Sequence, residues 1–281
     1  MANSAIDALT SPTLKHLREH WWDDGFTEFL RETLRPRPGN RILHVGCGRG
    51  TGEVAIGRLH LSQIRLFGVD LMVNRVLEAR KATASHNQRL GFASADVCRL
   101  PFKDGVFDST YCVALLQHIT EVGEAVRELA RVTAPGGRVL GVEPDNGARY
   151  WFSSTTSGMR VFQASTRFFA ALAEARGDRT DPAVGPKLPA IFARHGIEPL
   201  AVRLFPVSHA RVGKLPDSVW KERVDSVRRA IQRAPTPDIA AMGDDFLKLL
   251  DAYQKDAHAA GPAFVEIQNT MLFATVGQRG D

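Results

Sequence analysis

Three glycines at alternate positions form the most informative stretch of this 281-residue sequence. Gly46, Gly48 and Gly50 follow a short apolar segment and precede a helical pattern. Glycine lets the backbone turn sharply and lets a ligand lie against backbone N–H groups with no Cβ in the way. The spacing GxGxG differs from the dinucleotide-binding pattern GxGxxG, because Thr51 and Glu53 stand where that pattern needs its third glycine. A plain tight turn is the alternative interpretation.

Polar side chains follow the other predicted strands at the points where those strands end. Asp70 ends the second apolar segment, Gln117 and His118 lie just beyond the fourth, and Glu143 ends the fifth. Open α/β sheets bind ligands at the carboxyl ends of their strands, so we expect these side chains to gather there. An imidazole suits proton removal at neutral pH, which makes His118 a candidate general base, with Glu143 as a second candidate. The structural alternatives are a histidine that holds its loop and carboxylates that cap helices.

A parallel sheet is needed to position these residues, and apolar runs alternate with helical patterns in the order that builds one. We predict strands over residues 41–45, 64–69, 90–95, 107–114, 138–142, 198–207 and 264–276. We predict helices over residues 13–34, 52–60, 72–87, 121–133, 158–176, 183–195, 217–233 and 238–259. The sequence therefore predicts an α/β fold with a seven-stranded, mostly parallel sheet and helices on both faces.

The predicted domain organisation has a helical cap before the sheet and helical insertions late in the chain. Residues 1–38 form the N-terminal cap, and residues 39–281 form one ligand-binding domain. Insertions are expected at about residues 147–196 and 211–260. Their helices are amphipathic, so we expect them to cover a surface. We predict that residues 211–260 form a lid over the acceptor site, the place where a second substrate would bind beside the first ligand.

The segment His44-Val45-Gly46-Cys47-Gly48-Arg49-Gly50 resembles motif I of the class I S-adenosylmethionine-dependent methyltransferases. Further segments resemble later motifs of that family in the same order: Gly68-Val69-Asp70-Leu71, Ala95-Asp96-Val97, Leu100-Pro101-Phe102, Phe107-Asp108 and Ala134-Pro135-Gly136-Gly137. The closest resemblance is to the small-molecule methyltransferases of type 11, which include the ubiquinone and menaquinone C-methyltransferases. The resemblance implies a Rossmann-like fold and S-adenosyl-L-methionine as the cofactor.

The resemblance also implies roles for individual residues. Asp70 would accept hydrogen bonds from both ribose hydroxyls, and Asp96 would contact the adenine amine while Val97 packs on the ring. The other implied cofactor contacts are His44, Gly46, Cys47, Gly48, Gly50, Leu71 and Val113. The family usually has Asp or Glu at position 44, where it helps to hold the glycine loop and the methionine end of the cofactor. A neutral imidazole can still accept or donate a hydrogen bond there.

The predicted function is methyl transfer to a small-molecule acceptor. Oxygen and nitrogen are favoured as the methylated atoms, and carbon stays open. No Asn/Asp-Pro-Pro-aromatic motif follows the fourth strand, which argues against transfer to an adenine or glutamine amide nitrogen. Trp22, Gln117 and Trp151 are the predicted acceptor contacts, with ordinary core packing as the alternative for the aromatic residues. No metal site is predicted.

Composition excludes several other classes of protein. Hydrophobic residues make up 44% and charged residues 24%, unlike disordered chains or disulfide scaffolds. Three cysteines without a CxxC pair fit reduced thiols and a cytoplasmic location. No apolar run approaches the roughly 20 residues of a membrane helix, and the first residues do not resemble a secretory signal. A homodimer stays open.

The net charge of +5 invites a nucleic-acid interpretation. The basic excess lies between Arg203 and Arg233, where a solvated helix face is the favoured interpretation. The charge distribution therefore argues against nucleic acid as a partner, and an RNA methyltransferase is kept as one alternative function. A non-catalytic protein that binds S-adenosylmethionine is another, and His44 is the feature that motivates it.

Overall fold

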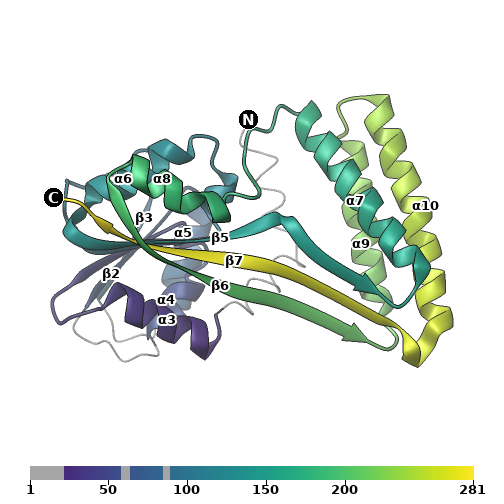
Figure 1. Ribbon diagram of the computed structural model, residues 1–281, viewed down its shortest axis with the longest axis horizontal. Coiled ribbons are helices and arrows are strands. Elements are labelled where there is room, and N and C mark those ends of the chain that lie inside the picture. Colours follow the sequence, from purple (N-terminus) through teal and green to yellow (C-terminus); the bar gives the residue numbers. More distant parts are fainter. Residues whose placement is uncertain (1–21, 58–63, 85–88) are drawn as a thin grey trace. The chain divides into compact units, whose positions relative to one another are not determined.

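A computed structural model describes residues 22–57, 64–84 and 89–281 of the protein (Figure 1). Its sheet has seven strands in the order β3-β2-β1-β4-β5-β7-β6. The strands are β1 (Arg41–Val45), β2 (Arg65–Asp70), β3 (Arg89–Ser94), β4 (Phe107–Val113), β5 (Thr133–Ser153), β6 (Ile197–Val212) and β7 (Val265–Arg279). Strands β1 to β5 pair in parallel, so the predicted seven-stranded, mostly parallel sheet is confirmed.

Helices alternate with the strands as the sequence predicts. They are α3 (Asp24–Leu34), α4 (Thr51–Gly57), α5 (Val73–Ala82), α6 (Val122–Val132), α7 (Thr156–Ala175), α8 (Leu188–Arg194), α9 (Asp217–Gln232) and α10 (Pro237–Ala260). Short 3-10 turns lie at Leu116–His118, Gly185–Lys187 and Gly261–Ala263. Parts of the predicted helices over residues 13–34, 52–60 and 72–87 lie outside the described residues. Among the described helices, none has the length and apolar character needed to cross a membrane.

Strand β5 is much longer than the predicted strand over residues 138–142. The prediction followed the apolar run, and Val139, Leu140 and Val142 are indeed fully buried. Beyond that run the strand continues to Ser153 through residues that are largely exposed, such as Tyr150. An apolar pattern marks only the buried part of a strand, so the remainder could not be seen from the sequence.

The chain divides into two compact units. The first comprises Met1–Gly147, Thr180–Phe205 and Met271–Asp281, and the second comprises Ala148–Arg179 and Pro206–Thr270. Strands β5, β6 and β7 each contribute residues to both units. The predicted insertion at residues 147–196 is divided between the units, because α7 belongs to the second and α8 to the first. The predicted cap boundary at residue 38 and the lid remain predictions.

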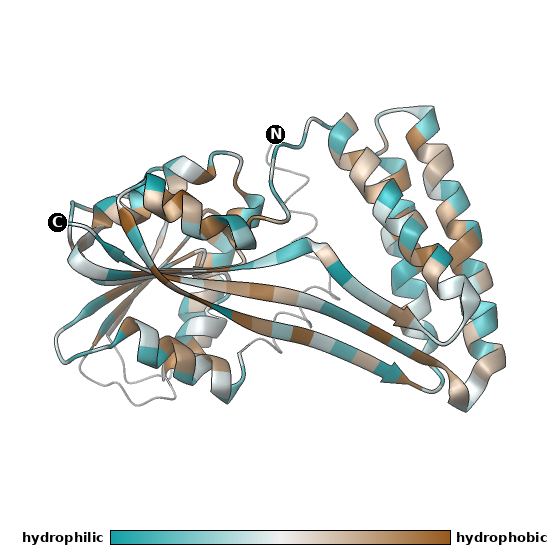
Figure 2. Cartoon of the chain, in the orientation of Figure 1, coloured by the Kyte–Doolittle hydropathy of each residue, from teal (hydrophilic) through white to brown (hydrophobic). Residues whose placement is uncertain are grey.

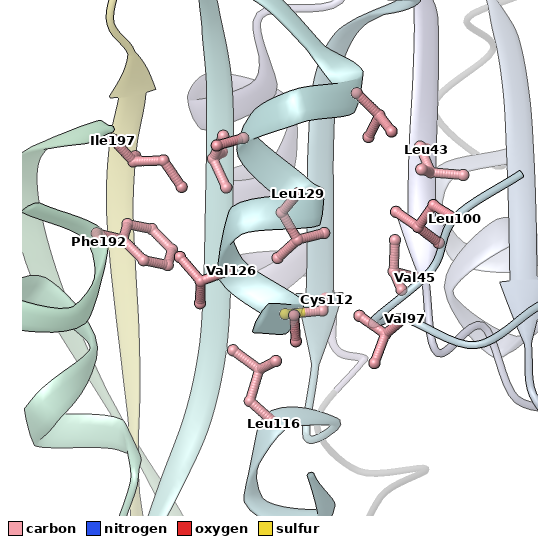
Figure 3. Packing of buried hydrophobic residues seen from close by; sticks show 14 of the residues in the cluster. Leu43, Val45, Val97, Leu100, Cys112, Leu116, Val126, Leu129, Phe192 and Ile197 are labelled. Atoms are coloured by element: carbon pink, nitrogen blue, oxygen red, sulfur yellow. The ribbon is translucent and has the colours of Figure 1, made fainter. Parts of the chain in front are cut away.

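The two faces of the sheet in the first unit carry different side chains because neighbouring residues of a strand point to opposite faces. Leu43, Val45 and Cys112 face a hydrophobic core that helices α6 and α8 complete (Figure 3). Ile42 and His44 face the opposite side, where α3 and α4 lie (Figure 1). The second face therefore buries the imidazole ring of His44.

The order of the strands creates a switch point in the first unit. Strand β1 lies between β2 and β4, so the chain builds outward on one side of β1 and then starts again on the other. Loops that leave neighbouring strands in opposite directions open a crevice at the carboxyl ends of those strands. The glycine loop follows β1 and a second loop follows β4, so both lie at the carboxyl ends of the strands that form this switch point.

The second unit has a core of its own. Helices α7, α9 and α10 mix apolar and polar residues along their lengths (Figure 2). Their buried side chains form one hydrophobic cluster, and its largest members include Trp220, Tyr253, Phe168 and Phe264. Both units therefore bury enough apolar surface to be compact.

Candidate functional site

The glycine loop adopts a backbone that glycine favours. The φ angles are +76° at Gly46, +54° at Gly48 and +83° at Gly50, all in the left-handed region. The backbone N–H groups of Gly46 and Cys47 donate to the carbonyl oxygen of Val69, at 2.7 and 2.9 Å. The loop is thus held against the end of β2. Burial raises the pKa of the Cys47 thiol, so this cysteine stays protonated and packs as an apolar group.

The three glycines have different surroundings, and these show which glycine allows close packing and which leaves room for a ligand. A Cβ on Gly46 would lie 3.0 Å from the Leu115 side chain, and one on Gly50 would lie 3.0 Å from Ala79. A Cβ on Gly48 would meet nothing within 4 Å among the described residues. Gly46 and Gly50 therefore allow close packing, whereas Gly48 leaves its backbone open to a ligand.

Asp70 lies beside this opening. Its Oδ2 accepts a hydrogen bond from the Gly48 N–H at 3.0 Å, and its Oδ1 accepts one from the Met72 N–H at 2.9 Å. A carboxylate has about four acceptor positions, so each oxygen can accept one further hydrogen bond. Two adjacent hydroxyls of a ribose match that capacity. Leu71, the next residue, is 60% exposed and offers an apolar surface beside the carboxylate.

Asp96 and Val97 follow the end of β3 and have different surroundings. Asp96 is exposed and its Oδ1 accepts a hydrogen bond from the Cys98 N–H at 2.9 Å. Val97, by contrast, is buried in the core with Val45. The predicted contact of Val97 with the adenine ring remains a prediction. Val113 is half-buried at the end of β4.

The loop after β4 is organised by Glu143. Its Oε1 accepts hydrogen bonds from the N–H groups of Leu115 and Leu116, both at 2.8 Å, and its Oε2 accepts one from Gln117 at 3.2 Å. Ala114, just before these residues, has a φ of +52°, which is unusual for a residue other than glycine. Glu143 is fully buried. These contacts favour a positioning role for Glu143 over the proton transfer that the sequence suggested.

Gln117 and His118 lie where the prediction put them. The side-chain oxygen of Gln117 accepts a hydrogen bond from Asn146 Nδ2 at 2.8 Å, and His118 ends the 3-10 turn Leu116–His118. The contact between Gly46 and Leu115 shows that this loop adjoins the glycine loop. The structure thus brings the predicted acceptor contact and the predicted base to the edge that carries Asp70.

His44 has a partner that the sequence analysis missed. Its Nδ1 lies 2.8 Å from Oε1 of Glu53, and its ring stacks on Tyr111 with centroids 4.2 Å apart. The His44 and Glu53 side chains are 3% and 0% exposed. A carboxylate therefore lies beside position 44, and it comes from helix α4. Glu53 gave no signal because it lies nine residues further along the chain.

The two predicted tryptophan contacts lie in different units. Trp22 lies edge-on to Phe26 and 6.1 Å from the His44 ring, and a Cβ on Gly52 would lie 2.6 Å from it. It therefore covers the start of α4. Trp151 belongs to the second unit, where it stacks on Phe162. Its role in acceptor binding remains a prediction.

The basic segment between Arg203 and Arg233 is not simply a solvated face. Arg211 and Arg223 both donate to the buried carboxylate of Glu266, at distances between 2.6 and 2.9 Å. Two of the cations that suggested RNA are thus paired with one buried carboxylate inside the second unit.

Comparisons with known proteins agree with this arrangement. A family described as a methyltransferase domain matches residues 43–141. The O-methyltransferase rstn1 of Aspergillus nomiae is 33% identical over 154 residues, which cover 50% of this chain and 67% of that protein. The demethylmenaquinone methyltransferase of Mycobacterium marinum is 29% identical over 132 residues, or 47% of this chain and 52% of that protein.

The fold has counterparts among solved structures. The crystal structure of the BH2331 protein from Bacillus halodurans C-125 superposes with a TM-score of 0.56 at 16% identity, and covers 92% of this chain and all of that one. The chain spans about half the length of most curated relatives it matches. The matched family, the related sequences and the shared fold all identify the same family of proteins. The chain belongs to the methyltransferase-domain family and has the class I fold, whose cofactor is S-adenosylmethionine.

Proposed function

We propose that this protein transfers the methyl group of S-adenosylmethionine to a small-molecule acceptor, at an oxygen or a nitrogen atom. One observation carries the proposal. The open backbone of Gly48 lies beside Asp70, whose two carboxylate oxygens can each accept one more hydrogen bond. Gly48 follows β1 and Asp70 ends β2, the strand that pairs with β1. When bound, the cofactor supplies a methyl group on a sulfonium, which is already an excellent leaving group.

The residues of the site would mainly bind and align the two reactants. Asp70 holds the ribose, the glycine loop lets the cofactor approach the backbone, and Glu143 fixes the loop that carries Gln117 and His118. Alignment of donor and acceptor can supply a large part of the rate enhancement in such a displacement. Where the acceptor is a hydroxyl or an ammonium group, we assign removal of its proton to His118.

The substrate class rests on weaker support than the cofactor. The matched relatives include an O-methyltransferase and a demethylmenaquinone methyltransferase, so small molecules are favoured over macromolecules as acceptors. RNA loses support because Glu266 binds Arg211 and Arg223. A cytoplasmic location and a homodimer are kept as parts of the proposal. A non-catalytic protein that binds the cofactor would give no turnover with any acceptor.

The first test measures cofactor binding by calorimetry. Asp70→Asn replaces one acceptor oxygen with a donor, so it should weaken S-adenosylmethionine binding by about 1.5 to 3 kcal/mol. Asp245→Asn is the matched control, since that aspartate is exposed on α10. An unchanged dissociation constant in folded Asp70→Asn protein would remove Asp70 from the site.

The second test measures turnover. Protein is incubated with S-adenosylmethionine labelled in its methyl group and with a panel of phenols, amines and quinols. We expect S-adenosylhomocysteine and a labelled product with at least one hydroxyl or amine acceptor. Product only from carbon acceptors would contradict the assignment to oxygen or nitrogen.

A further inference from the structure

Two arginines in the second unit share one buried glutamate. Arg211 of β6 and Arg223 of α9 donate to Glu266 of β7 at distances between 2.6 and 2.9 Å. The Glu266 side chain is 0% exposed. The other side chains that bond to this carboxylate are Tyr253 and Gln268, which are neutral. Two positive charges therefore face a single negative charge.

The surplus positive charge acts on Arg211 in particular. The ionised groups with the largest effect on this residue are Arg223 and Glu266, one cation and one anion. Burial lowers the pKa of the Arg211 guanidinium, and the charge of Arg223 lowers it further. A charge that is taken out of water is costly unless an opposite charge compensates it. An anion beside Arg211 would supply that compensation.

The two arginines differ in the N–H groups that they keep free. Nη1 and Nη2 of Arg223 both donate to Glu266, and its guanidinium lies 4.9 Å from the centroid of the Trp220 ring. Arg211 donates to Glu266 through Nη1 alone. Its Nε and Nη2 donate to none of the residues that the structure describes, and neither atom is fully buried. Arg223 therefore holds the glutamate, while Arg211 keeps one edge available.

The free edge of Arg211 has the geometry of an oxyanion site. The N–H groups of Nε and Nη2 on one guanidinium are nearly parallel, and they match two oxygens of a carboxylate or a phosphate. The Arg211 side chain is 18% exposed, so a ligand can reach it. The bond to Glu266 already fixes the guanidinium, so little further side-chain freedom is lost when a ligand binds.

We propose that Arg211 binds the carboxylate or phosphate group of a small molecule through the edge formed by Nε and Nη2, with Glu266 and Arg223 as positioning residues. This site goes beyond the proposed function and does not depend on the cofactor. A single, mostly buried cation suits a small molecule better than a nucleic acid, whose binding requires several phosphate contacts. The alternative is an ion-pair network that only fastens β6 and α9 to β7, and such a network has no affinity for anions.

The experiment follows thermal unfolding of the full-length protein at neutral pH and constant ionic strength. Inorganic phosphate, methyl phosphate and acetate are added in separate titrations, and chloride replaces them in the reference. A ligand that binds only the folded protein raises the unfolding temperature, and the concentration dependence gives its dissociation constant. We expect a rise with at least one of these anions, and the responding anion distinguishes a phosphate site from a carboxylate site. No rise above the chloride reference with any of them would overturn the proposal.

A variant locates the effect, because phosphate also stabilises folded proteins in general. Arg211→Lys keeps a positive charge beside Glu266 but lacks the planar fork, so it should bind the responding anion about 10-fold more weakly. Arg229→Lys is the matched control, since Arg229 is exposed on α9, and it should bind as wild type does. Equal affinities of wild type and Arg211→Lys would mean that the anion binds elsewhere, and the proposal would be wrong.

Discussion

The two units each bury a glutamate, and the two glutamates differ in how completely they are paired. In the second unit, Glu266 accepts hydrogen bonds from Arg211, Arg223, Tyr253 and Gln268. In the first unit, one oxygen of Glu53 bonds to His44 and the other has no partner among the described residues. Both oxygens of Glu266 are thus satisfied, whereas Glu53 keeps one buried acceptor oxygen without a partner among the described residues.

Glu143 is a third buried glutamate, and its pairing is intermediate between that of Glu266 and that of Glu53. Its carboxylate is fully buried, and three backbone N–H groups of the loop after β4 bond to it. Both oxygens therefore take part in holding the loop. Burial alone therefore does not identify a functional acid. The number of donors around the carboxylate is the better guide.

The largest expected effect concerns stability. Glu266→Gln leaves two arginines without their counterion and should lower the free energy of unfolding by about 3 kcal/mol. Glu53→Gln should cost only about 1 kcal/mol, because the amide oxygen can still accept from His44. Urea denaturation of both variants measures the difference. Equal losses would break the comparison, since both glutamates would then be structural.

A smaller effect should appear as the pH falls. Burial alone would raise the pKa of Glu266, but hydrogen bonds and charges from Arg223, Tyr253 and Arg211 outweigh burial and lower it. A carboxylate whose pKa is lower in the folded state stabilises the fold above its unfolded pKa of about 4.3. That contribution is lost as the pH falls through the lower, folded value.

Urea denaturation between neutral and acidic pH tests this linkage. The stability advantage of wild type over Glu266→Gln should be constant above the unfolded pKa and shrink below it. The variant serves as the control, because every other carboxylate, including Glu128 with its own lowered pKa, titrates in both proteins. A difference that stays constant down to strongly acidic pH would show that Glu266 does not titrate in this way.

Much of the fold follows from the sequence because its signals are local. Apolar runs located the strands, and the glycine spacing located the loop whose three φ angles are positive. The partners of the buried acids could not be found in this way. Glu266 lies 43 residues from Arg223 and 55 from Arg211, so only the tertiary fold joins them.

The candidate site shows the same limit. Asp70, Gln117 and His118 were found because they follow strand ends, and strand ends meet at one edge. Glu53 lies on a helix, and its importance depends on the His44 ring pointing at that helix. Alanine rarely adopts a positive φ, so the sequence could not reveal the φ of +52° at Ala114. Side-chain direction and backbone strain are set by packing, which no local pattern records.

The smallest expected effects concern the glycine loop, where the same contrast between packing and ligand access recurs. Alanine at either Gly46 or Gly48 must adopt a left-handed backbone, which costs about 1 kcal/mol. At Gly46 the new Cβ also meets Leu115 at 3.0 Å, whereas at Gly48 it meets nothing within 4 Å among the described residues. Gly46→Ala should therefore lose more stability than Gly48→Ala.

The two variants should rank in the opposite order for cofactor affinity. Gly48→Ala should lose more affinity than Gly46→Ala, although it loses less stability. The Cβ of Gly48→Ala would fill the opening beside Asp70, so binding of S-adenosylmethionine should weaken by about 10-fold or more while the fold loses only the backbone cost. Denaturation and calorimetry on the same two proteins separate the effects. If Gly48→Ala binds the cofactor as wild type does, the opening at Gly48 is a surface feature and the cofactor lies elsewhere along the loop.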